Sequence, residues 1–181
     1  MARKDAVRNR ARLVEAAAHS FRDRGLGVSV NAIADDAGVN VATLYRHFPT
    51  KDELIGAVFD ALLEPLAVAR DQALSAPGRG RLEMFVRAVV RLQAEQRGLV
   101  DALGQHPLDA EVRGRLRESA VAIVGPLVER AHEDGDLRDD VDALDLLVAL
   151  RMLAVVAGAP ELAPERGERY VDVVLRGLRR A

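Results

Sequence analysis

A chain of 181 residues that is 49% hydrophobic is long enough to bury one or two compact cores, which excludes a disordered protein. Only 3% of the residues are aromatic, so the core has to be built from Leu, Val and Ala, and this favours helices. The absence of cysteine excludes disulfides, thiolate metal sites and cysteine nucleophiles. The first residues are too charged for a signal peptide, and no apolar run reaches the roughly 18 residues of a membrane span, so we expect a cytoplasmic protein.

The net charge of −2 conceals an uneven distribution along the chain. Residues 1–51 contain nine Lys and Arg and five Asp and Glu, a balance of +4, whereas residues 52–181 contain 17 and 23, a balance of −6. A locally positive segment attracts a phosphate backbone, and an acidic remainder discourages indiscriminate binding of nucleic acid. Without a motif beside it, the basic segment is explained equally well as a solvated, arginine-rich helix face.

The first predicted helix covers residues 6–24. One face of it is apolar at helical spacing, formed by Val7, Ala11, Val14, Ala18 and Phe21. Gly25 ends the helix, and a short connection leads to Ser29.

Two short helical segments follow, separated by Gly38. Ser29 is placed to cap the first, and its apolar stripe comprises Val30, Ile33, Ala34 and Ala37. Gly38 ends this segment, because a residue without a Cβ adopts the left-handed turn at little cost.

Asn40 is placed to cap the second segment, predicted from Val41 to Phe48, with Leu44 and Phe48 facing inward. A turn of three to four residues containing Gly is the geometry that places a second helix in the major groove of DNA. The same spacing also occurs in ordinary helical bundles, so on its own it leaves a purely structural explanation open.

The stretch from residue 29 to residue 54 resembles the DNA-binding domain of the TetR family of bacterial transcriptional regulators. The matching residues are Ile33-Ala34, Ala37-Gly38-Val39, Thr43-Leu44-Tyr45, His47-Phe48, Pro49-Thr50-Lys51 and Glu53-Leu54. Including the preceding helix, the resemblance covers roughly residues 8–60. It implies an all-α protein with a three-helix, helix-turn-helix DNA-binding domain at residues 1–51. A helical effector-binding and dimerisation domain would occupy residues 52–181.

The resemblance also implies roles at a DNA surface. The expected base-edge readers are Asn31, Val41, Ala42 and Thr43. The Asn31 side chain has the donor and acceptor groups that recognise adenine, and the Thr43 hydroxyl can donate or accept a hydrogen bond. The apolar side chains of Val41 and Ala42 contact only apolar groups such as a thymine methyl. Many relatives carry a polar residue at position 41 and Gly at position 42, so this chain is expected to read a different operator or to depend more on DNA shape.

Other residues are expected to contact phosphates, which fixes the register of the protein on DNA without specifying sequence. These are Ser29, Tyr45, Arg46, His47 and Lys51. For Ser29, helix capping alone is an alternative role.

The C-terminal region reads as further helices. Thr50 and Glu53 form a capping pattern that opens a helix over residues 51–75, which connects the two domains and contains Pro65 as a possible kink. Residues 76–80 are predicted to be a linker. Its glycines are not followed by the Gly-Lys-Ser/Thr sequence that ends a phosphate-binding loop. Helices are then predicted over 81–97 and 109–132, the latter with a kink or break at Pro126.

A shorter segment over residues 99–103 and a turn over residues 105–107 are predicted between these two helices. Carboxylates are concentrated in residues 133–142, but they lack the register of a calcium loop, and we interpret them as a solvated turn with helix caps.

A helix predicted over residues 142–157 is apolar almost all round and therefore has to be covered on two sides. One side fits the intramolecular core, and a second copy of the chain fits the other. Together with a last helix over residues 164–179, it resembles the family's dimerisation element, although burial within a single chain is an alternative. The expected interface residues are Leu146, Leu147, Leu150, Leu153, Tyr170, Val174 and Leu178.

By the same resemblance, an effector bound in the C-terminal domain is expected to release the protein from an inverted-repeat operator, as a repressor or, more rarely, an activator. The candidate pocket residues are Met84, Phe85, Ala88, Gln93, His106, Met152 and Val155, each of which is also explained as ordinary core.

The sequence is less consistent with two other classes of protein. An enzyme is disfavoured because the four histidines fall on separate elements and no nucleophile elbow or dinucleotide fingerprint is present, and no cofactor is expected. A helical adaptor that binds another protein would not depend on Tyr45 or Lys51.

Overall fold

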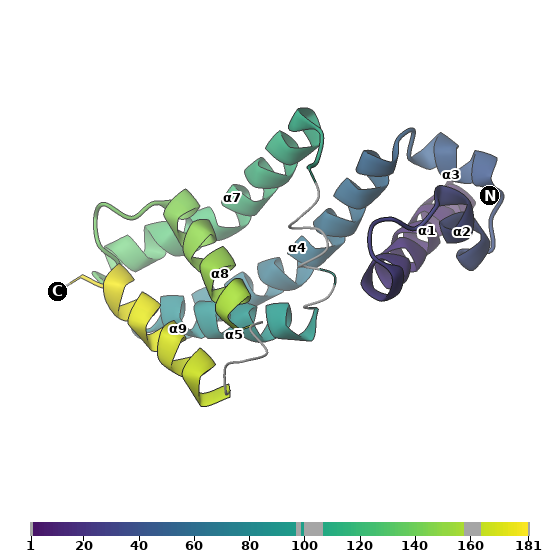
Figure 1. Cartoon of the computed structure of the whole chain (residues 1–181). Helices are drawn as coiled ribbons and strands as arrows, with labels where there is room; N and C mark the ends of the chain where they lie inside the picture. Colours follow the sequence, from purple (N-terminus) through teal and green to yellow (C-terminus); the bar gives the residue numbers. More distant parts are fainter. Residues whose placement is uncertain (1, 97–98, 100–106, 158–163, 181) are drawn as a thin grey trace. The chain divides into compact units, whose positions relative to one another are not determined.

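The computed structural model describes residues 2–96, 99, 107–157 and 164–180, and in this part of the chain every regular element is an α-helix (Figure 1). The helices are α1 (Ala2–Arg24), α2 (Val30–Asp36), α3 (Val41–His47), α4 (Lys51–Ser75), α5 (Arg81–Glu95), α7 (Ala110–Glu133), α8 (Ala143–Ala157) and α9 (Pro164–Leu178). The predicted all-α class is confirmed, and the predicted helix ends agree within a few residues.

The chain divides into two compact units, residues 1–62 with 98–116, and residues 63–97 with 117–181. The sequence placed the boundary at residue 51 instead. The difference arises because the first half of α4 packs with the N-terminal helices: Leu54, Ile55 and Val58 are buried in their core. Part of α7 also belongs to the first unit, so α4 and α7 each continue from one unit into the other.

The core of the first unit is built around α1, which packs on α2 and α3 (Figure 1). Its buried face carries Leu13, Ala17 and Phe21. The prediction was wrong for the start of α1, because Val7 and Ala11 are exposed. Apolar residues cover more than half the circumference of this helix, so periodicity alone did not select the correct stripe.

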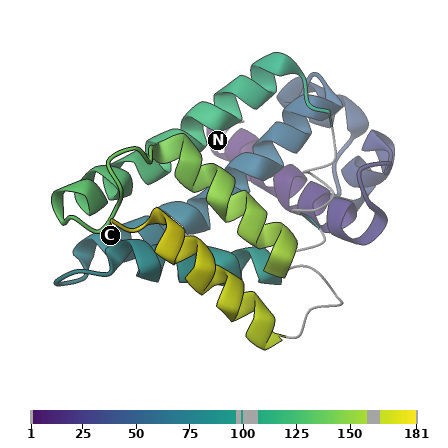
Figure 2. The same ribbon diagram turned by 60° about the vertical axis from the view of Figure 1, so that its left-hand side comes forward.

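The second unit has its own apolar core, in which α5 packs on α8 and α9, and α8 packs on α9 (Figure 2). Phe85 of α5, Leu127 of α7 and Leu146 of α8 are fully buried in it. The linker at residues 76–80 is a loop, as predicted, in which Gly78 and Gly80 both have positive φ.

Two proline-containing helices remain unbroken. Pro65 lies within α4 and Pro126 within α7, and both proline side chains are exposed. Water can satisfy the carbonyl that each proline leaves without a donor, and the predicted break at Pro126 does not occur. The predicted short segment at 99–103 and the turn at 105–107 lie outside the described residues, except for Leu99 and Pro107. No helix in the described part of the chain is long and apolar enough to cross a membrane.

Candidate nucleic-acid interface

The turn between α2 and α3 is fixed by the local interactions that the sequence predicts. The Ser29 hydroxyl oxygen accepts a hydrogen bond from the Ala32 amide at 3.2 Å and caps α2. Gly38 has φ of 64°, in the left-handed region that favours glycine. The Asn40 side chain accepts from the Ala42 amide at 2.8 Å and caps α3. Because each bond is local, the sequence determines both the end of α2 and the start of α3.

Helix α3 has one buried face and one exposed face. Leu44 is 1% exposed, and Phe48, immediately after the helix, is 2% exposed. On the other side, Ala42 and Arg46 are exposed, and the Tyr45 side chain is 49% exposed. The buried pair anchors the helix to the core, which leaves a rigid, partly polar surface free for a ligand.

The four expected base-reading residues have different exposures. Asn31 and Ala42 are exposed, whereas Val41 and Thr43 are half-buried at the start of α3. All four lie within the first turn of α2 or of α3. The first turn of the second helix in such a motif is the part that meets base edges.

The expected phosphate ligands Tyr45 and Arg46 are exposed and stand on α3. Ser29 is also exposed; its oxygen is used as a helix cap, but its hydroxyl proton remains to donate. His47 is half-buried, and its Nε2 atom is buried without a hydrogen-bond partner among the described residues.

Lys51 is half-buried, and its ammonium group donates to two backbone carbonyls, those of Leu26 and Val28, the latter at 2.8 Å. The side chain therefore ties the start of α4 to the connection between α1 and α2. An ammonium group has three protons, so one remains for a phosphate. The sequence did not reveal this structural role, since the contacting residues are more than 20 positions away.

One of the two acidic side chains at the end of α2, that of Asp36, is neutralised within the protein. Asp36 accepts from the buried Ser20 hydroxyl at 2.9 Å and forms an ion pair with Arg24. The hydrogen bond from Ser20, followed by that from Arg24, lowers the pKa of the Asp36 carboxyl. In contrast, Arg8, Arg12 and Arg46 form no ion pair with any described residue.

Arg10, which the sequence did not single out, lies on the ring of Phe48. Its guanidinium carbon is 5.1 Å from the ring centroid, a cation–π distance. The signal that was available is spacing: Arg10 lies three residues before Leu13 and seven before Ala17, on the core-facing side of α1.

The fold and this surface define a helix-turn-helix DNA-binding protein. The profile described as "Bacterial regulatory proteins, tetR family" matches residues 13–58, and the profile "Transcriptional regulator SbtR-like, C-terminal domain" matches residues 77–180. The chain therefore belongs to the TetR family of bacterial transcriptional regulators; it is a DNA-binding regulator and not an enzyme.

Several known proteins are similar over most of the chain. The TetR transcription regulatory protein from Mycobacterium vanbaalenii is 37% identical with a TM-score of 0.63, covering 99% of this chain and 100% of that one. The HTH-type transcriptional repressor KstR2 of Mycobacterium tuberculosis is 27% identical over 93% of this chain and 92% of its own length. The HTH-type transcriptional regulator EthR of Mycolicibacterium smegmatis is 27% identical over 77% and 70%, respectively.

The residues predicted to form a dimer interface do not share one surface. Leu146, Leu150 and Leu153 are 0%, 3% and 2% exposed within the single chain, so their assignment to an interface was wrong. They pack against α5 and α9 in the core of the second unit. Of the remaining residues, Tyr170 is exposed, whereas Leu147, Val174 and Leu178 are half-buried.

A different face of α8 is apolar and exposed. Its residues recur at helical spacing along one side of the helix: Leu144, Val148, Met152 and Val155. Tyr170 and Val173 are exposed on the neighbouring α9. Helix α8 therefore has two apolar sides, as predicted, but the exposed side is not the one that contains Leu146, Leu150 and Leu153.

The residues expected to line an effector pocket are also dispersed. Phe85 is fully buried in the core of the second unit, whereas Met84, Met152 and Val155 have exposed side chains. Ala88 and Gln93 are half-buried, and the Gln93 side-chain oxygen is buried without a partner among the described residues. His106 lies outside the described residues. The exposed three belong to the surface of α5 and α8.

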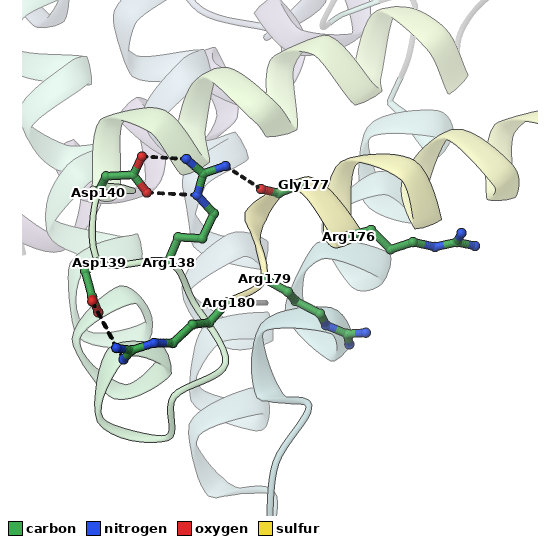
Figure 3. Close-up of a pocket in the computed structure, with 7 residues that line it drawn as sticks. All are labelled: Arg138, Asp139, Asp140, Arg176, Gly177, Arg179 and Arg180. Carbon is green, nitrogen blue, oxygen red and sulfur yellow. Dashed lines mark hydrogen bonds and ion pairs between the residues drawn. The ribbon is translucent and has the colours of Figure 1, made fainter.

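A groove of about 560 Å³ lies at the C-terminal end of α9, and its lining includes none of the described candidate residues (Figure 3). Its lining is charged: Arg138 donates to both oxygens of Asp140 and to the Gly177 carbonyl. Arg180 pairs with Asp139. Because three of its four arginines are paired with carboxylates and Arg138 also caps the end of α9, this groove is explained by the local structure.

Of the carboxylates predicted to form a solvated turn with helix caps, Asp142 is a cap, whereas the Asp134 side chain is only 12% exposed. Asp142 caps α8 by accepting from the amides of Leu144 and Asp145. Asp134 pairs with Arg81 and Arg130. Burial opposes ionisation of Asp134, but the two arginines together hold its pKa below the ordinary value. Among the described residues, no group of three or more His, Cys, Asp and Glu is placed to hold a metal ion.

Proposed function

We propose that this protein is a dimeric, sequence-specific repressor that is released from an inverted-repeat operator by a small-molecule effector. The observation that carries the proposal is the two-faced helix α3, which is anchored by Leu44 and Phe48 and presents Tyr45 and Arg46 to solvent. Such a helix is suited to enter the major groove without rearrangement of its core. The relatives named as KstR2 repressors, which are similar over 93% of this chain, support the repressor mode.

In this proposal the first turns of α2 and α3 read base edges. Asn31 recognises adenine, Thr43 forms a hydrogen bond with a base edge, and Val41 and Ala42 contact thymine methyl groups. Ser29, Tyr45, Arg46, His47 and Lys51 hold phosphates. The phosphate ligands supply salt-dependent affinity, whereas the four base readers supply the discrimination between sequences.

Dimerisation would occur through the exposed apolar face of α8 and α9. Leu144, Val148, Met152 and Val155 form a continuous stripe that a monomer would leave in water. A two-fold dimer presents two copies of α3, and a separation of about 34–36 Å would place them in successive major grooves. An inverted-repeat operator follows from the symmetry of such a dimer.

Effector release requires only that a ligand of the second unit favours a conformation with lower affinity for DNA. A coupling free energy of about 1–3 kcal/mol is typical of such systems. The Gln93 side-chain oxygen, which is buried and has no hydrogen-bond partner among the described residues, supports a polar contact with the effector near the C-terminal end of α5. Met84, Met152 and Val155 are not part of this proposal, because their side chains are exposed.

The proposal is tested by selecting bound duplexes from a random pool with the purified protein, and then repeating the selection with Thr43→Ala. One enriched inverted repeat is expected, and the substitution should relax the preference at specific symmetric positions by about 1–3 kcal/mol per base pair. Glu129→Gln is a suitable control, because Glu129 is exposed on α7, in the second unit. If no sequence is enriched even at low salt, sequence-specific regulation is excluded.

A further inference from the structure

Arg10 occupies a position where the pattern of α1 calls for an apolar side chain. The buried residues of this helix are Leu13, Ala17, Ser20 and Phe21. Arg10 lies on the same stripe of the helix, three residues before Leu13 and seven before Ala17. A charged residue in a core register breaks the local rule, and such positions in natural proteins tend to be functional.

The apolar stem of Arg10 allows it to occupy this position. Its guanidinium lies 5.1 Å from the centroid of the Phe48 ring, and that ring is almost fully buried. The side chain therefore covers the edge of the first core while its charge stays at the surface, where Arg10 as a residue is exposed. The stacking contact fixes the position of the cation without consuming its hydrogen-bond donors.

No acidic group in the described part of the chain neutralises this cation. Arg10 forms no ion pair or hydrogen bond with a described residue, and its contact is the ring of Phe48. By comparison, Arg24 on the same helix is paired with Asp36. Arg10 therefore retains all five N–H donors of its guanidinium for an external anion.

The location of Phe48 indicates which anion this is. Phe48 follows α3 directly, one residue after His47 and three after Tyr45, which is exposed. When the first turn of α3 meets base edges, its C-terminal end lies beside the sugar-phosphate backbone that borders the groove. A guanidinium held against Phe48 is then at the level of a phosphate, which its planar fork is suited to bind with two parallel hydrogen bonds.

We infer that Arg10 is a phosphate-binding residue of the DNA interface, held in place by its stack on Phe48. This inference rests on the proposed function, since it assumes that α3 enters the groove. It adds α1 to the elements that contact DNA. Because a phosphate contact carries no sequence information, Arg10 should add equally to the affinity for the operator and for unrelated duplexes.

The decisive variant is Arg10→Met, which keeps an unbranched apolar stem over Phe48 and removes the charge. The affinity for the selected operator and for a random-sequence duplex of equal length would be measured at several salt concentrations. Loss of one phosphate contact lowers the slope of log K against log salt by about 0.9 per protomer. For a dimer, the loss of affinity between 50 and 200 mM salt should therefore be roughly 12-fold smaller than for the parent protein.

Arg8→Met is the matched control, because Arg8 is an exposed arginine on the same helix that lies about half a turn away from the core-facing stripe. It removes the same charge and should leave the slope near that of the parent. Arg10→Lys retains the charge and should keep most of the slope. If Arg10→Met folds poorly, as judged by its urea midpoint, Arg10→Gln gives the same test.

Each outcome decides the inference. A reduced slope for Arg10→Met on both duplexes, with parent-like slopes for Arg8→Met and Arg10→Lys, supports it. A parent-like slope for Arg10→Met overturns it while the proposed function stands, because the operator is still bound. If the parent protein binds no duplex at low salt, the proposed function fails, and this inference fails with it.

Discussion

Gly56 allows the first half of α4 to approach α7 closely. A Cβ atom added at this position would lie 2.9 Å from Cγ1 of Val112 and 3.4 Å from the guanidinium of Arg115. Both partners belong to the first unit, in which Arg115 also pairs with Glu53 of α4. The glycine is therefore explained by packing and not by backbone conformation.

Gly56→Ala is expected to destabilise the protein, despite the better helix propensity of alanine. The gain from propensity is about 1 kcal/mol, whereas overpacking of a tight contact costs about 1–3 kcal/mol. The net loss should be about 0–2 kcal/mol, measured as the change in the free energy of unfolding in urea.

The double variant Gly56→Ala with Val112→Ala provides the control, because it removes the atom that the new methyl group would contact. In the Val112→Ala background, Gly56→Ala should stabilise the protein by about 1 kcal/mol. Stabilisation of the same size in both backgrounds would show that the close approach imposes no constraint.

Whether a residue's role was predictable depended on how far away its partners lie in the chain. The caps formed by Ser29, Asn40 and Thr50 were predicted because each acceptor bonds to an amide two or three residues ahead. The contacts of Lys51 and Arg10 were not, because their partners are 25 and 38 residues away, and periodicity carries no information about such pairs.

At the level of elements, α5 and α9 are joined by a network of charged side chains. Arg87 of α5 donates to Glu83 on its own helix and to Glu168 and Asp172 of α9. Arg179, just after α9, also pairs with Glu83. Glu83 thus lies between two arginines and is only partly exposed.

The hydrogen bonds from Arg87 and then Arg179 lower the pKa of the Glu83 carboxyl. A carboxyl whose pKa is lower in the folded state stabilises the protein above its unfolded-state pKa, about 4.3, and this contribution is lost as the pH falls through the folded-state pKa. Glu83→Gln should therefore lower the urea midpoint at pH 7, and the difference from the parent should shrink as the pH falls below about 4.

Glu129→Gln serves here as the comparison, since Glu129 is exposed on α7 and forms no ion pair with a described residue. Its urea midpoint should follow that of the parent at every pH. If the difference in urea midpoint between Glu83→Gln and the parent stays constant between pH 7 and pH 3, the ionised carboxyl of Glu83 contributes nothing to the stability of the protein.

The helix α8 shows what amphipathicity can and cannot specify. Its composition predicted correctly that two sides are apolar. Choosing between them failed, because Leu146 and Val148 are equally apolar and only packing against α5 and α9 decides which one is buried. A narrow apolar stripe, as on α3, leaves no such ambiguity, and Leu44 and Phe48 were assigned correctly.

At the level of the whole molecule, the question is what covers the exposed face of α8. This face carries four exposed apolar side chains side by side: Leu144, Val148, Met152 and Val155. On a solvated helix, exposed apolar residues are usually scattered singly. If two copies of the chain meet through this face, a charged residue introduced there is present in both copies, close to the two-fold axis. Association would then bury two like charges near each other, and the cost should prevent it.

Val148→Asp is therefore expected to convert a dimer into a folded monomer with much weaker operator binding, because each α3 would then bind its half-site alone. Val68→Asp is a matched control. Val68 on α4 and Val148 are both 51% exposed, so the two substitutions should have similar effects on the stability of the monomer. Sedimentation velocity would give the oligomeric state, and circular dichroism would confirm that the helices are retained. A parent protein that is monomeric at micromolar concentration, or a Val148→Asp variant that remains dimeric, would place the two-fold contact elsewhere.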